Sequence, residues 1–290
     1  MKELVIVSGK GGTGKTSVTA SFAVLANRPV VADCDVDAAD LHLVLGPRLR
    51  RRHEFWSGYK AVIRQEDCIR CGLCLEYCRF GAVQSSGGTA GDALWSVDSV
   101  SCEGCGVCVR FCPVGAIDFP ERLCGEWMVS DTRCGPMVHA RLGVAAENSG
   151  KLVSTVRREA RRIAEEGNHP IVIVDGPPGI GCPVIASVTG ASSVLVVTEP
   201  TVSGEHDLER VITLTRHFEI PTSVCVNKWD INAGMTERIE DKARRSGARI
   251  AGRIRYDSAV TLAQMRMRAV VETDAPCAED IRLVWNQLGL

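Results

Sequence analysis

Gly9-Lys10-Gly11-Gly12-Thr13-Gly14-Lys15-Thr16 is the stretch that decides the fold of this chain. It fits the phosphate-binding pattern G-x4-G-K-S/T and lies between an apolar run and a segment of helical character. Glycines let backbone N–H groups wrap around phosphate oxygens, and the amino end of the following helix adds positive potential. The pattern therefore predicts that Lys15 contacts the β- and γ-phosphates of a nucleotide and that Thr16 binds Mg²⁺.

Apolar strands alternate with helices around this motif and again in the second half of the chain. Buried strands that alternate with helices indicate an α/β fold, with a mostly parallel sheet covered on both faces. The expected strands are Leu4–Ser8, Val30–Cys34, Ile171–Asp175, Val194–Thr198 and Val224–Asn227, and the expected helices include Gly14–Ala26 and Ser149–Glu166.

Two copies of C-x2-C-x2-C-x3-C interrupt the α/β pattern. This is the spacing of bacterial two-cluster ferredoxins, in which the fourth cysteine of each run binds the other cluster. Zinc also binds paired CxxC motifs, but zinc needs only two cysteines from each half and here each half supplies four. We therefore expect two 4Fe–4S clusters, one held by Cys68, Cys71, Cys74 and Cys112 and the other by Cys102, Cys105, Cys108 and Cys78.

The motifs divide the chain into three parts. Residues 1–56 and 121–290 are expected to form one P-loop domain, and residues 57–120 a ferredoxin-like α+β insert. A basic run, Arg48–His53, leads into the insert. We interpret it as a solvated linker in preference to a docking site for an acidic partner.

Bulk composition excludes several classes of protein. The 290 residues carry a net charge of −1, so no global attraction to nucleic acid or to an anionic membrane is expected. No stretch approaches the roughly 20 apolar residues of a membrane span, and the amino-terminal apolar run is too short for a signal peptide. Fourteen cysteines without a secretory signal favour metal binding over disulfides. The expected location is the cytoplasm.

Lys10, the second lysine of the phosphate loop, indicates a particular family of P-loop proteins. The sequence K-G-G-x-G-K-T is similar to the deviant P-loop of the MinD/ParA family, which includes Mrp-type cluster carriers and the nitrogenase iron protein. The resemblance implies ATP or ADP as the nucleotide, and it implies that Lys10 reaches the nucleotide of a dimer partner. It also implies that Asp35 activates the attacking water, with Asp33 on the same strand. The full set of expected nucleotide ligands is Gly9, Lys10, Gly11, Gly12, Thr13, Gly14, Lys15, Thr16, Ser17, Asp33, Asp175 and Asn227.

Two further segments resemble the same family. Ile171–Gly179 is similar to its Walker B strand and second switch, with Asp175 near Mg²⁺. Val226–Lys228 is similar to the segment that contacts adenine through Asn227, although an asparagine at a strand end is commonly only a turn residue. Cys182 lies at an offset from Asp175 similar to that of a cluster-binding cysteine in the nitrogenase iron protein. We weigh a redox or metal role for Cys182 equally against an inert one.

The segments Arg133–Ala140 and Glu147–Leu152 resemble MinD-like ATPases with a ferredoxin insert, some of them from orange-protein complexes. His139 is either a redox-site residue or, preferably, a packed one. Ser149 also fits the first turn of a helix.

Three functions compete on this evidence. The favoured function is an ATPase that couples a nucleotide-driven dimer switch to electron transfer, and the alternative is an ATP-dependent carrier or assembly factor for iron–sulfur clusters. The third, a positioning ATPase, is disfavoured because Ile281, Val284, Trp285 and Leu288 predict a core-packing last helix rather than a membrane-binding one. The expected partners are a second copy or a similar ATPase and a redox or metallocluster protein, with no nucleic acid and no membrane.

Overall fold

A computed structural model of the chain describes residues 1–86, 94–143 and 149–290. These residues divide into two compact units. The first unit contains Met1–His53, Glu126–Leu142 and Ser149–Leu290, and the second contains Glu54–Gly125 together with Gly143. The residues expected to form the ferredoxin-like insert, 57–120, lie inside the second unit.

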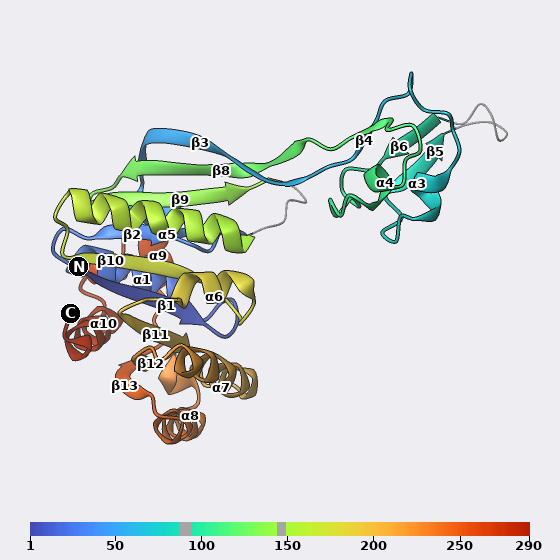
Figure 1. Cartoon of the computed structure of the whole chain (residues 1–290). Coiled ribbons are helices and arrows are strands. Elements are labelled where there is room, and N and C mark those ends of the chain that lie inside the picture. The colour runs from blue at the N-terminus through green and yellow to red at the C-terminus, as the bar shows by residue number, and fades with distance from the viewer. Residues whose placement is uncertain (87–93, 144–148) are drawn as a thin grey trace. The chain divides into compact units, whose positions relative to one another are not determined.

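A nine-stranded sheet forms the centre of the first unit, in the order β13-β12-β11-β1-β10-β2-β9-β8-β3 (Figure 1). All pairings from β13 through to β9 are parallel, which confirms the predicted mostly parallel α/β fold. The strands are β1 (Lys2–Ser8), β2 (Val30–Asp33), β3 (Arg48–Tyr59), β8 (Glu121–Asp131), β9 (Pro136–Leu142), β10 (Ile171–Pro178), β11 (Ser193–Thr198), β12 (Thr222–Asn227) and β13 (Arg249–Ile254).

Helices cover both faces of this sheet (Figure 1). Residues alternate between the two faces of a strand, so Leu4 and Ile6 of β1 point to one side and Val5 and Val7 to the other. Leu4 and Ile6 join a buried cluster with α1 and α10. The helices are α1 (Lys15–Leu25), α2 (Leu41–Leu45), α5 (Ser149–Glu166), α6 (Cys182–Val188), α7 (Val202–His217), α8 (Ala233–Arg245), α9 (Ala259–Met265) and α10 (Pro276–Leu288), with short 3-10 turns η1 (Trp229–Ile231) and η2 (Val270–Glu272).

The last helix, α10, packs into the core as predicted. Ile281 and Val284 are buried, and Trp285 packs against Phe22 of α1 with a ring separation of 4.9 Å. Within the described residues, none of the helices has both the length and the apolar character needed to cross a bilayer.

The basic run Arg48–His53 is not a linker, which corrects the interpretation from sequence. It lies in β3, the edge strand of the sheet, and its arginine side chains are exposed. Arg50 lies 3.3 Å from Asp131 and Arg52 lies 3.4 Å from Glu126, both acids of β8. Charged side chains on an edge strand discourage pairing with another sheet. The arginines of this run therefore suit an edge strand, although their composition alone suggested a loop.

The second unit consists of short elements. Two small antiparallel pairings, β4 with β7 and β5 with β6, accompany two one-turn helices. Both helices begin after a glycine in the left-handed region, Gly72 with φ 77° and Gly106 with φ 72°, as the repeated cysteine motif requires. The elements are β4 (Val62–Ile63), α3 (Leu73–Glu76), β5 (Val83–Ser86), β6 (Leu94–Val97), α4 (Val107–Arg110) and β7 (Ile117–Asp118).

Candidate functional site

The phosphate-binding loop runs from the end of β1 into α1. Gly12 and Gly14 adopt left-handed φ angles of 80° and 87°, which residues with side chains rarely adopt. Gly9 packs so closely against α7 that a Cβ atom would overlap Asp207. These three positions therefore need glycine, and the loop curls so that the amino end of α1 faces its interior.

Lys15 and Asp175, far apart in the sequence, meet behind this loop. The Lys15 Nζ atom lies 2.9 Å from Asp175 Oδ1 and 3.3 Å from Asp35 Oδ2. Thr16 Oγ1 donates to Asp175 Oδ2 at 2.8 Å. They meet because β1, β10 and β2 are parallel neighbours whose carboxyl ends share one edge of the sheet.

Thr19 belongs to the same cluster, although it was not among the residues expected from sequence. Its Oγ1 atom donates to Asp175 Oδ1 at 2.7 Å, so that both carboxylate oxygens of Asp175 are held from α1. Thr19 follows Lys15 by one helical turn, and that spacing was the one available signal. Ser17, in contrast, accepts a hydrogen bond from Gln264 at 2.9 Å.

The cluster carries an excess of carboxylates. Burial raises the pKa of Asp33, and the neighbouring Asp175 raises it further, while Lys15 opposes the rise. Burial also raises the pKa of Asp35, again against the opposing charge of Lys15. For Lys15, burial lowers the pKa, but Asp175 and Asp35 outweigh burial and the net shift is upward. A divalent cation would relieve this repulsion.

Two buried oxygen atoms in the same place have no hydrogen-bond partner in the described part of the chain, Thr13 Oγ1 and Asp33 Oδ2. Unpaired buried polar atoms are costly, and functional sites are where they persist. Together with the crowded carboxylates, they fit a site for a magnesium-bound nucleotide.

Asn227 and Lys228 approach the phosphate loop from the end of β12. Asn227 Nδ2 donates to the carbonyl oxygen of Thr13 at 2.8 Å, and Lys228 Nζ donates to that of Gly12 at 3.1 Å. Lys228 has a left-handed φ of 56°. Lysine rarely adopts this conformation, and such strain is concentrated at functional sites. The sequence drew attention to Asn227, but it gave no role to Lys228.

Lys10 is held within its own chain. Its Nζ atom lies 2.6 Å from Glu199 Oε1 and donates to Ser203 at 2.9 Å and Thr201 at 3.2 Å. Burial raises the pKa of Glu199, but Lys10 and Lys228 outweigh it and the net shift is downward. Glu199 is therefore an anion that holds two lysines beside the phosphate loop, and sequence reasoning did not identify it.

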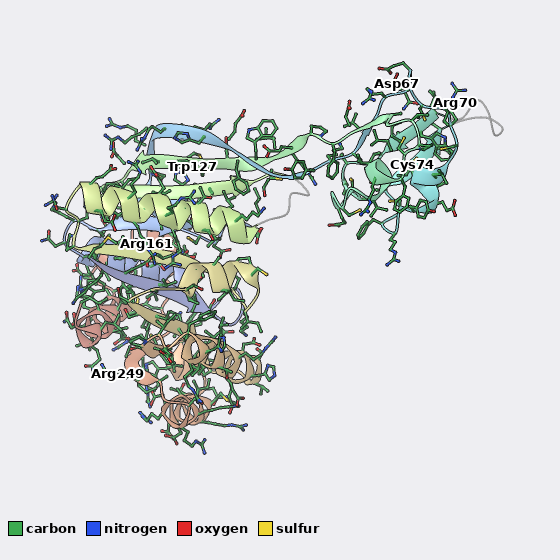
Figure 2. All side chains as sticks on the ribbon, in the orientation of Figure 1. Asp67, Arg70, Cys74, Trp127, Arg161 and Arg249 are labelled. Carbon is green, nitrogen blue, oxygen red and sulfur yellow. The ribbon has the colours of Figure 1, made fainter. Side chains whose placement is uncertain are left out.

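In the second unit, the eight cysteines of the repeat surround two small cavities. Each cavity has three cysteines from one run and the fourth from the other run, the grouping expected from sequence. Cys74 is labelled within this unit in Figure 2. One cavity is lined by Cys68, Cys71, Cys74 and Cys112, and the other by Cys78, Cys102, Cys105 and Cys108.

Donors to sulfur are present around these cavities. Ala116 N–H donates to Cys112 Sγ at 3.3 Å. Burial raises the pKa of Cys78, but backbone N–H groups, led by that of Phe80, outweigh burial and lower it. Trp95 lines the cavity that contains Cys68, and its buried Nε1 atom has no partner in the described part of the chain. Thiolate ligands, amide donors and an unpaired indole N–H fit iron–sulfur clusters, whose sulfur atoms accept hydrogen bonds. Among the described residues, no group of three or more His, Cys, Asp or Glu side chains is arranged to hold a single metal ion.

The other cysteines and His139 line neither of the two cavities. Cys182 is exposed at the start of α6, next to Gly150 of α5. Cys34 and Cys225 are buried in the core. His139 Nε2 lies 2.9 Å from Ser130 Oγ, and burial, assisted by His42, lowers the pKa of His139 to about 4. His139 is therefore a packed neutral residue. Glu147 and Asn148, part of the segment singled out in the sequence, lie outside the described residues.

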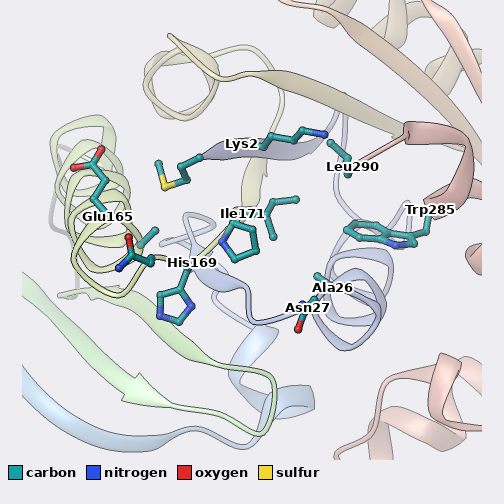
Figure 3. Close-up of a pocket in the computed structure, with 12 residues that line it drawn as sticks. Lys2, Ala26, Asn27, Glu165, His169, Ile171, Trp285 and Leu290 are labelled. Atoms are coloured by element: carbon teal, nitrogen blue, oxygen red, sulfur yellow. The ribbon is translucent and has the colours of Figure 1, made fainter.

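A cavity of about 770 Å³ lies at the opposite end of the parallel strands, where β1 and β10 begin (Figure 3). Lys2 and Ile171 come from those strand starts, and Trp285 comes from α10. Ligands of open parallel sheets bind at the carboxyl ends of the strands, and this cavity contains none of the site residues described above.

Comparison with known proteins finds relatives of both units of the chain. Residues 61–119 match the 4Fe-4S dicluster domain family. The uncharacterized protein MJ0578 of Methanocaldococcus jannaschii is 36% identical over 234 residues, 79% of each chain. MJ0579 of the same organism is 27% identical over 241 residues, 80% of this chain and 83% of that protein.

Solved structures give the fold of the first unit. The MinC:MinD cell division protein complex of Aquifex aeolicus matches with a TM-score of 0.59 at 19% identity, covering 100% of this chain and 96% of that chain. MinD of Pyrococcus horikoshii, complexed with Mg-ADP, matches with a TM-score of 0.60 at 14% identity, covering 99% and 95%. The chain therefore belongs to the family of MJ0578, and it joins a P-loop fold of the MinD/ParA type to an inserted 4Fe–4S dicluster domain.

Proposed function

We propose that this chain is an ATPase in which a nucleotide-driven dimer switch is coupled to electron transfer through two 4Fe–4S clusters. The observation that carries the proposal is a buried lysine, Lys15, held by Asp35 and Asp175 behind a phosphate loop, in a chain that also surrounds two cavities with four cysteines each. The P-loop binds the nucleotide phosphates and Asp35 serves hydrolysis, whereas clusters in a ferredoxin-like domain are usually electron carriers.

The side chains of the first unit have defined tasks in this proposal. When the γ-phosphate enters the loop, Lys15 exchanges its two carboxylate partners for phosphate oxygens. Thr16 holds Mg²⁺, which neutralises phosphate charge, and Asp175 stays oriented by Thr16 and Thr19. Asp35, released from Lys15, is free to orient the attacking water.

The dimer switch depends on Lys10. In this structure Glu199 holds the Lys10 ammonium group within its own chain. A lysine that reaches across a dimer to a partner's phosphate acts like an arginine finger supplied in trans. Lys10 must therefore leave Glu199 before it can act on the partner, and its release would link nucleotide binding to dimerisation.

The second unit supplies the redox function. The expected ligands are Cys68, Cys71, Cys74 and Cys112 for one cluster and Cys102, Cys105, Cys108 and Cys78 for the other. Bound clusters of this type take up and release one electron at a time. Trp95 and the backbone amides around Cys78 and Cys112 tune the polarity of the two cavities.

The test is anaerobic purification followed by iron analysis and EPR-monitored redox titration, with and without Mg-ATP. We expect about eight iron atoms per chain and a cluster potential that changes when ATP binds. Lys15→Ala should weaken ATP binding by about 10- to 100-fold, because it removes a charge-assisted phosphate contact of about 1.5–3 kcal/mol. In that variant the ATP-dependent change in potential should disappear.

Two results would redirect the proposal. Stoichiometric zinc in a colourless anaerobic preparation would exclude the clusters. Loss of a cluster to an apo-acceptor on addition of ATP, with no change in potential, would favour the alternative function of cluster carrier. Asp35→Ala separates catalysis from binding, since it should bind ATP and accumulate the dimer without hydrolysis.

A further inference from the structure

The turn after β12, Asn227-Lys228-Trp229-Asp230, is fixed rigidly beside the phosphate loop. Asn227 and Lys228 donate to the carbonyl oxygens of Thr13 and Gly12, as described above. The guanidinium group of Arg253 on β13 lies 5.5 Å from the centre of the Trp229 ring. These contacts place the turn where the base of a nucleotide bound to the loop would lie, at the carboxyl edge of the sheet.

Asp230 connects this turn to the next one. The backbone N–H of Tyr256, in the loop after β13, donates to Asp230 Oδ1 at 2.7 Å. In the described part of the chain, the other oxygen, Oδ2, takes part in no hydrogen bond or ion pair. The nearby Arg255 is bound instead to Asp280 at 2.7 Å. Asp230 is therefore an exposed carboxylate whose Oδ2 is unused and whose Oδ1 keeps a second lone pair, so both oxygens can still accept hydrogen bonds.

Each of the two turns that Asp230 connects carries an exposed apolar side chain. Ile231 is 64% exposed and Tyr256 is 58% exposed. A flat aromatic base could cover the exposed part of such side chains. The turn thus offers a hydrogen-bond acceptor together with apolar surface, the combination that small-ligand sites use for orientation and affinity.

The two purines differ in what they offer to a carboxylate. N7 is a hydrogen-bond acceptor in both adenine and guanine, so an amide N–H of Asn227 would donate to either base. The opposite edge of guanine presents two donors, N1–H and the 2-amino group, which pair with the two oxygens of a carboxylate. Adenine presents a lone pair at N1, which a carboxylate repels, beside its 6-amino donor. An ionised carboxylate accepts hydrogen bonds and donates none, so Asp230 suits guanine.

We infer that GTP is a second substrate of this nucleotide site and that Asp230 is the residue that recognises guanine. The inference rests on the proposed nucleotide site and adds a base to it. ATP binding depends on the phosphate loop and the N7 contact, whereas GTP binding gains the bidentate contact with Asp230.

The experiment is calorimetric titration of the full chain, purified anaerobically with its clusters, with Mg-ADP, Mg-GDP and Mg-XDP. We expect the parent to bind GDP at least as tightly as ADP. Asp230→Ala should weaken GDP binding at least tenfold and ADP binding less than threefold. Asp230→Asn keeps an oxygen for the Tyr256 amide and adds a donor, so it should come to prefer XDP, whose base has a carbonyl group where guanine has its amine. Asp241→Asn, an exposed acid of α8, is the matched control and should change none of the three affinities.

Each outcome decides the inference. A parent that binds ADP but not GDP would overturn it and leave the proposed ATPase intact. Equal weakening of GDP and ADP in both Asp230 variants, without a gain of XDP, would show that Asp230 only supports the loop. Failure of the parent to bind either diphosphate would refute the proposed nucleotide site, and the GTP inference with it.

Discussion

Trp95 gives the sharpest test of the iron–sulfur proposal, because the structure singles out one atom. Its Nε1–H is buried without a partner, and its ring lines the cavity of Cys68, Cys71, Cys74 and Cys112. A Cβ atom on Gly72 would lie 3.8 Å from Cζ2 of Trp95, so the nitrogen-bearing edge of the indole faces the loop between two of these cysteines. Among the residues that the structure describes, no Trp side chain lines the other cavity. We predict that Trp95 donates to a cluster sulfur.

The expected size of the effect follows from one hydrogen bond. A hydrogen-bond donor stabilises the reduced cluster, which is more negative, more than it stabilises the oxidised cluster. We take this difference in free energy as about 1 kcal/mol, a fraction of a typical hydrogen bond to a charged group. For a one-electron couple about 1.4 kcal/mol corresponds to about 59 mV, so the bond raises the potential by about 40 mV. Trp95→Phe keeps an aromatic ring and removes the donor, and it should lower the potential of that cluster by about this amount.

The assay is an EPR-monitored redox titration of the parent and of Trp95→Phe, with iron content measured on the same samples. Trp127→Phe is the matched control, since Trp127 lines neither cavity and should leave both potentials unchanged. The reasoning fails if both potentials of Trp95→Phe match those of the parent at full iron content. It fails also if the cluster of Cys102, Cys105 and Cys108 shifts instead.

Three further predictions concern the cysteines and the lysine switch. Cys112→Ala should remove about four of about eight iron atoms and the EPR signal that Trp95→Phe shifts, whereas Cys78→Ala should remove the other signal; the reverse assignment would disprove the crossed ligation. In the proposed mechanism Lys10 acts on the partner's phosphate, so Lys10→Ala should keep ATP affinity within about threefold but abolish ATP-dependent dimers in sedimentation. Glu199→Gln should release Lys10 and produce dimers at lower ATP concentration. Parent-like dimerisation in Lys10→Ala would contradict the trans mechanism. Cys182→Ser should reduce the effect of ATP on cluster potential if this exposed thiol connects the two activities, and it is structural if ATPase rate, iron content and potential all equal those of the parent.

Features that depend on neighbouring residues in the chain were predictable from the amino-acid sequence. Glycines at 12 and 14 and a lysine at 15 specify a phosphate loop and a helix start within a few residues, since the backbone geometry of such a turn depends on its own residues. Buried apolar strands between helices specified the parallel sheet, because only a sheet covered on both faces tolerates them. The cysteine spacing predicted two sets of four ligands, because short loops determine which sulfur atoms can converge.

Contacts between distant segments, in contrast, depend on how the strands and helices pack. Asp175 meets Lys15 and Thr19 because β10 pairs with β1, and the sequence does not state which strands are neighbours. Glu199 and Lys228 reach the phosphate loop from the ends of other strands in the same way. The basic run became an edge strand because β8 provides its hydrogen-bond partners and its acids, although its composition suggested a solvated loop. Strand order and long-range pairing are properties of the packed chain, and they turn scattered carboxylates and lysines into one charged site.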